Sequence, residues 1–487
     1  MKNSTFIREA KNRGSVASIS NGVKKQKTRI EKDSLGTRPV PAGAYYGIET
    51  VRALENFPVS GLGFHPCFIW ALAVIKKACA LSNRSLGRLD TRRAGAIIKA
   101  CDEMMAGIHD KEFVTDALQS GAGVSVHMNT NEIITNRALE ILGREKGDHD
   151  HLHSHDHVNM GQSTNDVIPT ALRLAVLKIT EDFMVASRDL EDALNKKARE
   201  FSSIIKAGRT HLQDAAPVTL GQEFGGWAYQ LQKARGRVVL MVAGLLDLGI
   251  GGSAVGTGLN TSLRYTKAVV GNLKKLTGFP VKSARNLFSV MQNDADFAAV
   301  SGTLRDYSLS LIQIANDLRL LSSGPNTGFG EIRLPALQPG SSIMPGKVNP
   351  VIPEVAAQVG YQVIGNDTAI AFAAASGECE LNVMRPVIIH NLLQSFEILK
   401  NTVRLLAKKC IRGIKADKKK CREHAEKSFG IAAALNPYIG YSKAAECVKD
   451  AIQSGQTLRQ VVLSKGLLKG KELACILSPG NLTQPPK

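Results

Sequence analysis

The fold is decided by DVIPTALRLAVLKITEDFMVASRDLEDALNKKAREF (166–201), in which apolar residues recur every three or four positions for many turns. This spacing is typical of an α-helix. A second stretch, FAAVSGTLRDYSLSLIQIANDLRLLSS (297–323), repeats the pattern. Helices that are this long and apolar on more than one side must be buried against several neighbours. The two stretches therefore predict an all-α fold around a bundle of long helices, and apolar stripes left on the bundle surface would require partner subunits.

Shorter helical patterns flank this bundle. Upstream, they run from about 66 to 145 with short breaks, and the turn formers of DSLGTRPVPAGAYYG (33–47) predict an extended or looped segment. Downstream of about 416 the chain becomes rich in lysine and returns to shorter helices. We therefore predict a basic arm followed by three helical domains, with the boundaries 1–32, 33–163, 164–415 and 416–487.

Composition agrees with packed helices. Of the 487 residues, 44% are hydrophobic and only 5% are aromatic, a balance that suits helices better than a sandwich or propeller. The eight cysteines are far apart and form no C-x-x-C pair, which predicts free, mostly core-filling thiols in a reducing compartment. The longest apolar run, from Cys67, stops at Lys76 and Lys77, too short to cross a membrane. We expect a soluble cytoplasmic protein with no membrane partner.

Much of the formal charge of +19 lies in the first 32 residues, which carry nine Lys or Arg against two Glu. Such a segment buries too little apolar surface to order itself, so we predict a disordered arm. A cleavable organelle-targeting peptide is the alternative, and it would make the protein organellar. Binding of nucleic acid is a further alternative, which deletion of the arm would test. We expect no nucleic-acid partner, and the remaining positive charge would attract a small anion.

Five segments interrupt the helical pattern with glycine and small polar residues. Loops held by a rigid scaffold are where binding groups tend to lie, so these segments are the candidate functional sites. They are SGAGVSVHMNTNE (120–132), VNMGQSTND (158–166), GRTHLQD (208–214), GIGGSAVGTGLN (249–260) and GSSIMPGKVNP (340–350).

The segment GSSIMPGKVNP has the most chemistry. Gly340 permits a sharp turn with exposed N–H groups, which together can bind an anion. The following residues supply hydroxyls (Ser341 and Ser342), a cation (Lys347) and an amide (Asn349). Pro345 and Gly346 predict a second turn that brings Lys347 back over the loop. One interpretation is a clamp for a carboxylate that also holds a base; the alternative is a solvated surface loop.

Two further segments combine small polar groups with a helix end or a histidine. Asn165 or Asp166 of VNMGQSTND can cap the following helix, and the same helix start can bind a carboxylate through its N–H groups. GRTHLQD places Thr210 beside His211, a candidate catalytic histidine, although a single histidine is more often structural.

Two patterns invite cofactor or metal interpretations that we reject. GIGGSAVGTGLN contains a G-x-G-x-x-A string, but the preceding VVLMVAGLLDL is helical in pattern, whereas a dinucleotide site requires a strand there. The alternating run from His149 to His157 would align its imidazoles only on a strand, and it has no cysteine or carboxylate cluster of familiar spacing. We predict a polar loop, with no metal and no cofactor.

Together, in this order and spacing, the five segments resemble the aspartase/fumarase superfamily, and the resemblance covers nearly everything from Asp33 onward. GSSIMPGKVNP is similar to the signature loop of that superfamily. The resemblance implies an all-α, three-domain subunit whose central helices form the multi-helix core of a homotetramer. It also implies active sites assembled from three chains, which interconvert fumarate and a substituted succinate without metal or organic cofactor.

The resemblance also implies a role for each matching residue. Ser341 would be the general base. Lys347 and Asn349 would bind a carboxylate or the leaving-group side of the substrate. Thr210 and His211 would contact the substrate, and Glu354 would pair with His211. The carboxylates, and the amino group in an aspartase, would be held by Ser163, Thr164, Asn165 and Ser342.

The implied reaction explains these residue types. A C–H bond beside a carboxylate is a very weak acid, so its proton leaves only if the charge is taken up as an aci-carboxylate dianion. Fixed donors aimed at that group lower the barrier by roughly 3 kcal/mol each. A serine hydroxyl is a poor base in water, and it needs surrounding N–H groups and the nearby Lys347 to stabilise its alkoxide.

The choice of substrate depends on details of the resemblance. SGAGVSVHMNTNE and GAYYGIETVRALENF favour the aspartase branch and thus reversible deamination of L-aspartate to fumarate and ammonia. Arg385, where aspartases usually carry Glu, and the following RPVIIHNLLQS favour the fumarase branch and thus malate. Three further positions depart from the expected residues: Val124 for Thr, His127 for Asn and Asn326 for Arg. We predict an aspartase, with a fumarase or a re-specialised or inactive paralogue as alternatives.

Overall fold

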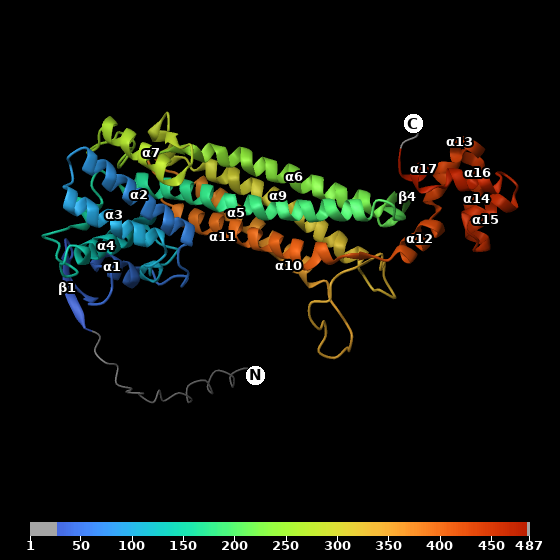
Figure 1. Cartoon of the computed structure of the whole chain (residues 1–487), viewed down its shortest axis with the longest axis horizontal. Helices are drawn as coiled ribbons and strands as arrows, with labels where there is room; N and C mark the ends of the chain where they lie inside the picture. Colours follow the sequence, from blue (N-terminus) through green and yellow to red (C-terminus); the bar gives the residue numbers. More distant parts are fainter. Residues whose placement is uncertain (1–26, 485–487) are drawn as a thin grey trace, which may run out of the picture.

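The computed structural model describes residues 27–484. Figure 1 shows an elongated molecule with a helical N-terminal part at one end, a bundle of long helices in the middle and a small helical part at the other end. Helices make up most of the described chain, as the sequence predicts. Most of the basic arm, residues 1–26, lies outside the described residues.

The described chain begins with an antiparallel hairpin of β1 (Thr28–Asp33) and β2 (Gly36–Pro41). The Arg29 guanidinium donates to the carbonyl groups of Pro41, at the end of β2, and of Ala44, in the loop that follows it. The buried Glu31 carboxylate accepts the first N–H of the next helix at 2.9 Å. The predicted disordered arm is therefore wrong for residues 28–32. Their charged side chains are satisfied by the backbone of the neighbouring segment, so they are ordered despite their low apolar content.

The N-terminal part is a layer of helices with two short 3-10 turns and one π-helical turn. Its helices are α1 (Ile48–Asn56), α2 (Pro66–Ser85), α3 (Thr91–Met105) and α4 (Val124–Ile141), and its short turns are η1 (Asp110–Glu112), η2 (Gly121–Gly123) and η3 (Ser154–Val158). Within this part α2 packs against α3, and α3 packs against α4. The helix α7 (Leu263–Thr277), from further along the chain, also packs against α2.

Five long helices form the central bundle: α5 (Thr164–Glu200), α6 (Leu220–Val242), α9 (Ala295–Leu321), α10 (Val351–Ala374) and α11 (Arg385–Leu405). Helix α5 lies against α6 and α11, while α9 lies against α6 and α10. Helix α5 also reaches α2, so it joins the bundle to the N-terminal part (Figure 1). The two stretches that predict long helices therefore correspond to α5 and α9.

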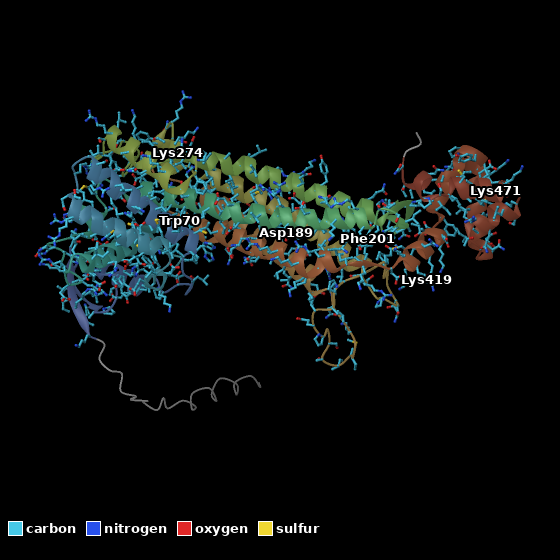
Figure 2. All side chains as sticks on the ribbon, in the orientation of Figure 1. Trp70, Asp189, Phe201, Lys274, Lys419 and Lys471 are labelled. Carbon is cyan, nitrogen blue, oxygen red and sulfur yellow. The ribbon has the colours of Figure 1, made fainter. Side chains whose placement is uncertain are left out.

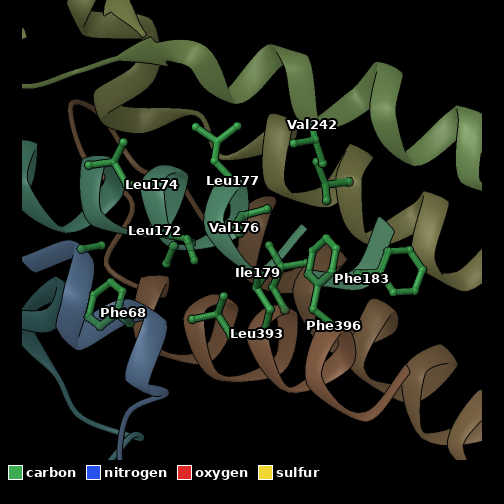
Figure 3. Packing of buried hydrophobic residues seen from close by; sticks show 14 of the residues in the cluster. Phe68, Leu172, Leu174, Val176, Leu177, Ile179, Phe183, Val242, Leu393 and Phe396 are labelled. Atoms are coloured by element: carbon green, nitrogen blue, oxygen red, sulfur yellow. The ribbon is translucent and has the colours of Figure 1, made fainter. Parts of the chain in front are cut away.

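The interior of the bundle is aliphatic with a few aromatic contacts. Figure 3 shows Phe183 of α5 beside Phe396 of α11, and their rings meet edge to face with centroids 5.8 Å apart. Tyr307 of α9 approaches Phe183 in the same way at 5.2 Å. Three helices thus meet at one aromatic cluster, an arrangement that contributes about 1 kcal/mol per ring pair beyond simple burial.

Short strands and turns connect the long helices. An antiparallel hairpin joins α5 to α6, a parallel two-residue pair follows α6, and an antiparallel pair links the chain before α10 to the C-terminal part. These connectors are β3 (Ile205–Thr210), β4 (Gln213–Thr219), η4 (Ala243–Leu246), β5 (Asp247–Leu248), β6 (Lys282–Ser283), α8 (Leu287–Gln292), β7 (Ile332–Arg333), η5 (Leu406–Cys410), η6 (Ile411–Gly413) and β8 (Lys415–Ala416).

The C-terminal part has its own small core, which includes Leu435, Cys447 and Val462. Its elements are α12 (Lys418–Lys427), η7 (Phe429–Leu435), α13 (Asn436–Ile439), α14 (Tyr441–Ser454), α15 (Leu458–Ser464), α16 (Gly470–Ile476) and α17 (Pro479–Thr483). The N-terminal part and the bundle share one continuous core instead. The division into three domains therefore stays a proposal.

The cysteines are all free thiols, and most of them fill the core. Five are buried, namely Cys79, Cys101, Cys410, Cys421 and Cys447, which confirms the expected structural use of cysteine. Within residues 27–484 no helix combines the length and apolarity that crossing a membrane requires.

Candidate active site

The first candidate site lies at the start of α5. Ser163 caps this helix, because its Oγ accepts the Asn165 N–H at 3.2 Å, while Asp166 Oδ1 accepts the Ser163 N–H at 2.9 Å. The prediction that Asn165 or Asp166 is the cap is therefore wrong. The backbone of Ser163 is still extended, so the helix begins at Thr164. Asp166 is then the third helical residue and completes the capping box.

The carboxylate of Asp166 joins the helix start to the glycine-rich loop 249–260. Its Oδ2 accepts the N–H groups of Gly251 and Ser253, each at 3.0 Å. Asn165 Nδ2 donates to a carbonyl group of the same loop at 2.8 Å. Burial raises the pKa of Asp166 to about 6 in spite of these donors. Two of the five polar segments are thus held together by one buried carboxylate.

A third segment, 120–132, meets the same helix start. Gly123 has φ +95°, and a Cβ there would lie 3.2 Å from the Ile168 side chain of α5, so the contact requires glycine. The expectation that the whole segment interrupts the helices is wrong, because α4 already begins at Val124. Most of its polar side chains are buried in α4, so the segment has the polar composition of a loop although most of it is helical.

Behind the helix start lies a buried chain of three polar side chains. Lys76 of α2 is fully buried, and its Nζ lies 2.7 Å from His127 Nε2 of α4. His127 Nδ1 in turn lies 2.7 Å from Thr164 Oγ, at the first position of α5. Burial lowers the pKa of His127, and the neighbouring Lys76 lowers it further, so the ring is neutral.

A cavity of about 540 Å³ opens beside Val124 and Ser125. The buried Glu132 also lines it and accepts the N–H groups of Gly47 and Glu49, each at 2.8 Å. Burial raises the pKa of Glu132 to about 7, although these donors oppose the shift. The cavity therefore combines an apolar wall at Val124 with a carboxyl group that titrates near neutrality.

The alternating histidines do not lie on a strand. Residues 154–158 form the π-helical turn η3, and His155 pairs with Glu49 at 2.6 Å. The expected polar loop is therefore partly a helical turn, and several carboxylates around it each bind a single imidazole. Within residues 27–484 no group of three or more His, Cys, Asp or Glu side chains is placed to hold a metal ion.

The signature loop 340–350 is closed at its base by its own backbone. The Gly340 N–H donates to the Lys347 carbonyl at 2.7 Å, and Asn349 Nδ2 donates to the Gly340 carbonyl at 2.8 Å. A Cβ on Gly340 would lie 2.7 Å from the Lys347 oxygen, so close approach and not an unusual φ requires this glycine. Gly346, with φ +80°, makes the second turn. The loop projects from the bundle before α10 (Figure 1).

Inside this loop the Ser341 hydroxyl lies in a small nest of N–H groups. Its Oγ accepts the N–H of Ile343 at 3.2 Å and that of Met344 at 2.9 Å. Such donors stabilise negative charge on the oxygen. Ser342, Ile343, Met344 and Lys347 are exposed in the single chain, so nothing in residues 27–484 covers the loop.

Thr210 and His211 lie at the tip of the hairpin that joins β3 to β4. His211 and Leu212 form its two-residue turn with φ +55° and +59°, a conformation that costs non-glycine residues about 1 kcal/mol or more each. Arg209 anchors the hairpin through Glu331, with two N–O distances of 2.8 and 3.1 Å. The turn is strained yet firmly held, and both Thr210 and His211 are exposed.

Glu354 lies in the first turn of α10 and is half-buried. No hydrogen bond or ion pair between Glu354 and His211 occurs within residues 27–484. The expected pairing of these two residues therefore stays a prediction for an assembled protein.

The single chain does not bring all the candidate residues together. Ser163, Thr164 and Asn165 lie at one end of α5, and the hairpin with His211 follows its other end (Figure 1). Figure 2 shows this direction through Trp70, Asp189 and Phe201, which lie in turn along the molecule. At a rise of 1.5 Å per residue, the 37 residues of α5 span about 55 Å. A small substrate would not reach both ends.

Lys76 is the functional candidate that sequence reasoning missed. It ends an apolar run beside Lys77, a position that the sequence analysis treated only as the limit of that run. The overlooked signal is the spacing along the helix. Lys76 is four residues after Leu72 and three before Cys79, both of which are buried, so its side chain lies on the buried face of α2. Lys77 points outward and binds Asp102.

The fold and these sites define a helical lyase subunit. Residues 36–365 match the family model described as Lyase, and residues 431–484 match the one described as Fumarase C C-terminus. The chain belongs to the fumarate lyase superfamily, which confirms the resemblance to aspartases and fumarases.

Individual relatives include both kinds of enzyme. The aspartate ammonia-lyase of Bacillus subtilis (strain 168) is 46% identical over 457 residues, which cover 94% of this chain and 96% of that protein. The class II fumarate hydratase of Halobacterium salinarum is 48% identical over 456 residues, which cover 93% and 97%. These similar identities leave the substrate to be decided by the site.

Solved structures share the whole fold. Fumarate lyase:delta crystallin from Brucella melitensis, solved with cobalt bound, matches with a TM-score of 0.92 at 47% identity, over 94% of this chain and 100% of that one. Recombinant class II fumarase from Schistosoma mansoni matches with a TM-score of 0.88 at 37% identity, over 93% and 98%.

Proposed function

We propose that the protein is an aspartate ammonia-lyase that converts L-aspartate reversibly to fumarate and ammonia. The observation that carries this proposal is the Ser341 hydroxyl, whose Oγ accepts two backbone N–H groups inside the closed loop 340–350. Those donors favour the alkoxide, the form of serine able to remove a proton from carbon. Several similar proteins, from Bacillus, Pseudomonas and Helicobacter, are aspartate ammonia-lyases.

In the proposed reaction the Ser341 alkoxide takes the proton from the carbon next to one carboxylate. The C–H electrons move into that carboxylate, which becomes an aci-carboxylate dianion. When these electrons return, they form the C=C bond of fumarate and break the C–N bond of the substrate's ammonium group, whose bonding pair leaves with nitrogen as neutral ammonia. Hydrogen-bond donors aimed at the dianion lower the barrier, since the charge is greatest there.

The other candidate residues divide into three groups in this proposal. Lys347 and Asn349 bind a carboxylate or the leaving-group side of the substrate. Thr210 and His211 contact the substrate, with Glu354 pairing with His211. The carboxylates are held by Ser163, Thr164, Asn165 and Ser342, of which the first three lie at a helix start whose N–H groups and dipole favour an anion.

We also propose that the protein is a homotetramer whose active sites each combine three chains. Two observations support it. First, one group of candidate residues lies at the start of α5 and another in the hairpin that follows its other end, and the helix between them spans about 55 Å, so one chain is incomplete on its own. Second, the bundle leaves large apolar side chains exposed, including Leu240 (67%) and Phe372 (74%), which a partner subunit would cover. The free thiols support a cytoplasmic location.

A class II fumarase is the second candidate function. The observation that favours it is Arg385, since the sequence resemblance leads us to expect Glu there in an aspartase. The fumarate hydratase from Halobacterium salinarum is also as similar to this chain as the aspartases are. In that case water would take the place of ammonia, and Ser341 would keep its role.

Parallel assays with L-aspartate, L-malate and argininosuccinate test the proposal, with fumarate formation followed by its ultraviolet absorbance. We expect activity with L-aspartate and its loss in Ser341→Ala. A matched control is Ser454→Ala, an exposed serine at the end of α14, which should keep full activity. Turnover of L-malate alone would establish the fumarase instead. Full activity of Ser341→Ala would remove the proposed base.

A further inference from the structure

The buried Lys76 side chain has a complete set of hydrogen bonds. Its Nζ donates to Asn159 Oδ1 at 3.0 Å and to Gln162 Oε1 at 2.8 Å, and it lies 2.7 Å from His127 Nε2. The orientation of both amides is fixed, because their NH₂ groups donate to backbone carbonyls. Three partners, one from α4 and two from the turn that precedes α5, therefore match the three N–H bonds of an ammonium group.

The ammonium group fixes the direction of the next two hydrogen bonds. It has donors only, so His127 Nε2 must accept from Lys76. The neutral ring then carries its one proton on Nδ1, which lies 2.7 Å from Thr164 Oγ and donates to it. Both buried side chains thus act on a single hydroxyl group.

Thr164 is left with a free donor. Among the hydrogen bonds of residues 27–484, its Oγ takes part only in the one from His127. Because the oxygen already accepts there, the hydroxyl proton is available to an acceptor at the start of α5. That is where the proposed function puts a substrate carboxylate.

We propose that Lys76 and His127 are positioning residues that orient the Thr164 hydroxyl as a hydrogen-bond donor to a carboxylate of the substrate. This inference rests on the proposed function for the role of Thr164. It gives a use to His127, which stands where the resemblance leads us to expect Asn. It also explains why a lysine is buried where an apolar side chain would pack at less cost.

The protonation state of Lys76 decides the pH at which the inference must be tested. Burial lowers the pKa of Lys76 to about 7, while the nearby Asp166, Cys79 and Cys101 raise it. Without its proton, Lys76 would accept from His127 and the whole chain of hydrogen bonds would reverse. At pH 6 the ammonium form dominates, so binding should be measured there.

Calorimetry with the unreactive dicarboxylate succinate tests the inference on the full-length protein at pH 6. Thr164→Val, which removes the hydroxyl but keeps the shape, should raise the dissociation constant about tenfold. His127→Phe should do the same, and the double variant should be no worse than either single one. Thr164→Ser and His127→Gln, which retain a hydroxyl and a donor–acceptor pair, should restore much of the affinity.

Thr170→Val is the matched control, because Thr170 is another buried threonine of α5 that bonds only the Asp166 carbonyl. It should leave succinate binding unchanged. If His127→Phe weakens binding as strongly in the Thr164→Val protein as in the wild type, its effect does not pass through Thr164 and the inference is overturned.

Neutron diffraction of the unliganded wild-type protein at pH 6 is an independent measurement that needs no variant. Deuterium on His127 Nδ1 is expected, and deuterium on Nε2 alone would overturn the inference. Neither experiment depends on turnover. If the wild-type protein has no ammonia-lyase activity, but the Thr164 and His127 variants still show the expected non-additive effect on succinate binding, only the proposed function is contradicted.

Discussion

Arg385 and Asp294 form a fully buried ion pair, with Nε lying 3.2 Å from Oδ2 and both side chains at most 1% exposed. Arg385 also donates to the Asn165 carbonyl at 3.3 Å, directly behind the proposed carboxylate site. The arginine that departs from the aspartase pattern thus has a structural partner in this chain. The ion pair with Asp294 explains why an arginine is present at position 385, and no contact with the substrate is needed to explain it.

Removal of this arginine should destabilise the protein strongly. Arg385→Met leaves the Asp294 carboxylate buried without its counter-ion, which costs about 3–5 kcal/mol. Arg385→Glu should be at least as harmful, because it adds a second buried carboxylate. Thermal unfolding followed by circular dichroism measures both effects.

The double variant Asp294→Asn/Arg385→Gln is the control for that prediction. It replaces the ion pair with two neutral amides, so it should recover part of the lost stability. Equal melting temperatures for the wild type and Arg385→Met would show that the pair contributes nothing.

Val124→Thr should improve substrate binding. Val124 lines the cavity beside the start of α4, and the resemblance leads us to expect a carboxylate-binding threonine there. One added hydrogen bond of about 1 kcal/mol corresponds to a KM for L-aspartate that is roughly fivefold lower. Steady-state kinetics measures it, with Val124→Ala as the control for a change of size alone. A threonine variant no better than the alanine variant would contradict the expected contact.

The fold could be predicted from the sequence because its signal is repeated. Apolar spacing over 37 residues specifies α5, and Pro169 inside the helix does not interrupt it. The hairpin that begins at Thr28 was missed because its order comes from Arg29 and Glu31 bonding backbone groups 12 and 17 residues further along the chain, and the composition of the arm alone does not show these partners.

The site could be predicted only in part. The loop around Ser341 has a distinctive local composition, so it was found together with its nest of N–H groups. Lys76 and His127 were not joined to Thr164, because their contact depends on how α2, α4 and α5 cross, and sequence spacing within one helix contains no information on that crossing.

Asp166 should make stability depend on pH between about 4 and 6. Its pKa is raised to about 6 in the folded protein, so the folded state binds this proton more tightly than the unfolded state does. Stability should therefore fall as pH rises from about 4 to 6, and the loss should level off above that range. Asp166→Asn removes this titration. The difference in melting temperature between wild type and variant should change across that interval, and a constant difference would contradict the raised pKa.

Mixed tetramers test whether one active site draws on different chains. Asn165→Ala and His211→Ala should each abolish most activity, since both residues are proposed to contact substrate. Asn165 lies in the first turn of α5 and His211 lies beyond the other end, so in the proposed assembly a site takes them from two different subunits. Unfolding and refolding an equal mixture of the two variants should then produce some sites with both residues intact, about a quarter of all sites under random assembly. The recovered activity should approach a quarter of the wild-type value, while each variant refolded alone stays inactive. If both residues served a site from the same chain, every site in the mixture would carry one defect, and no activity would return.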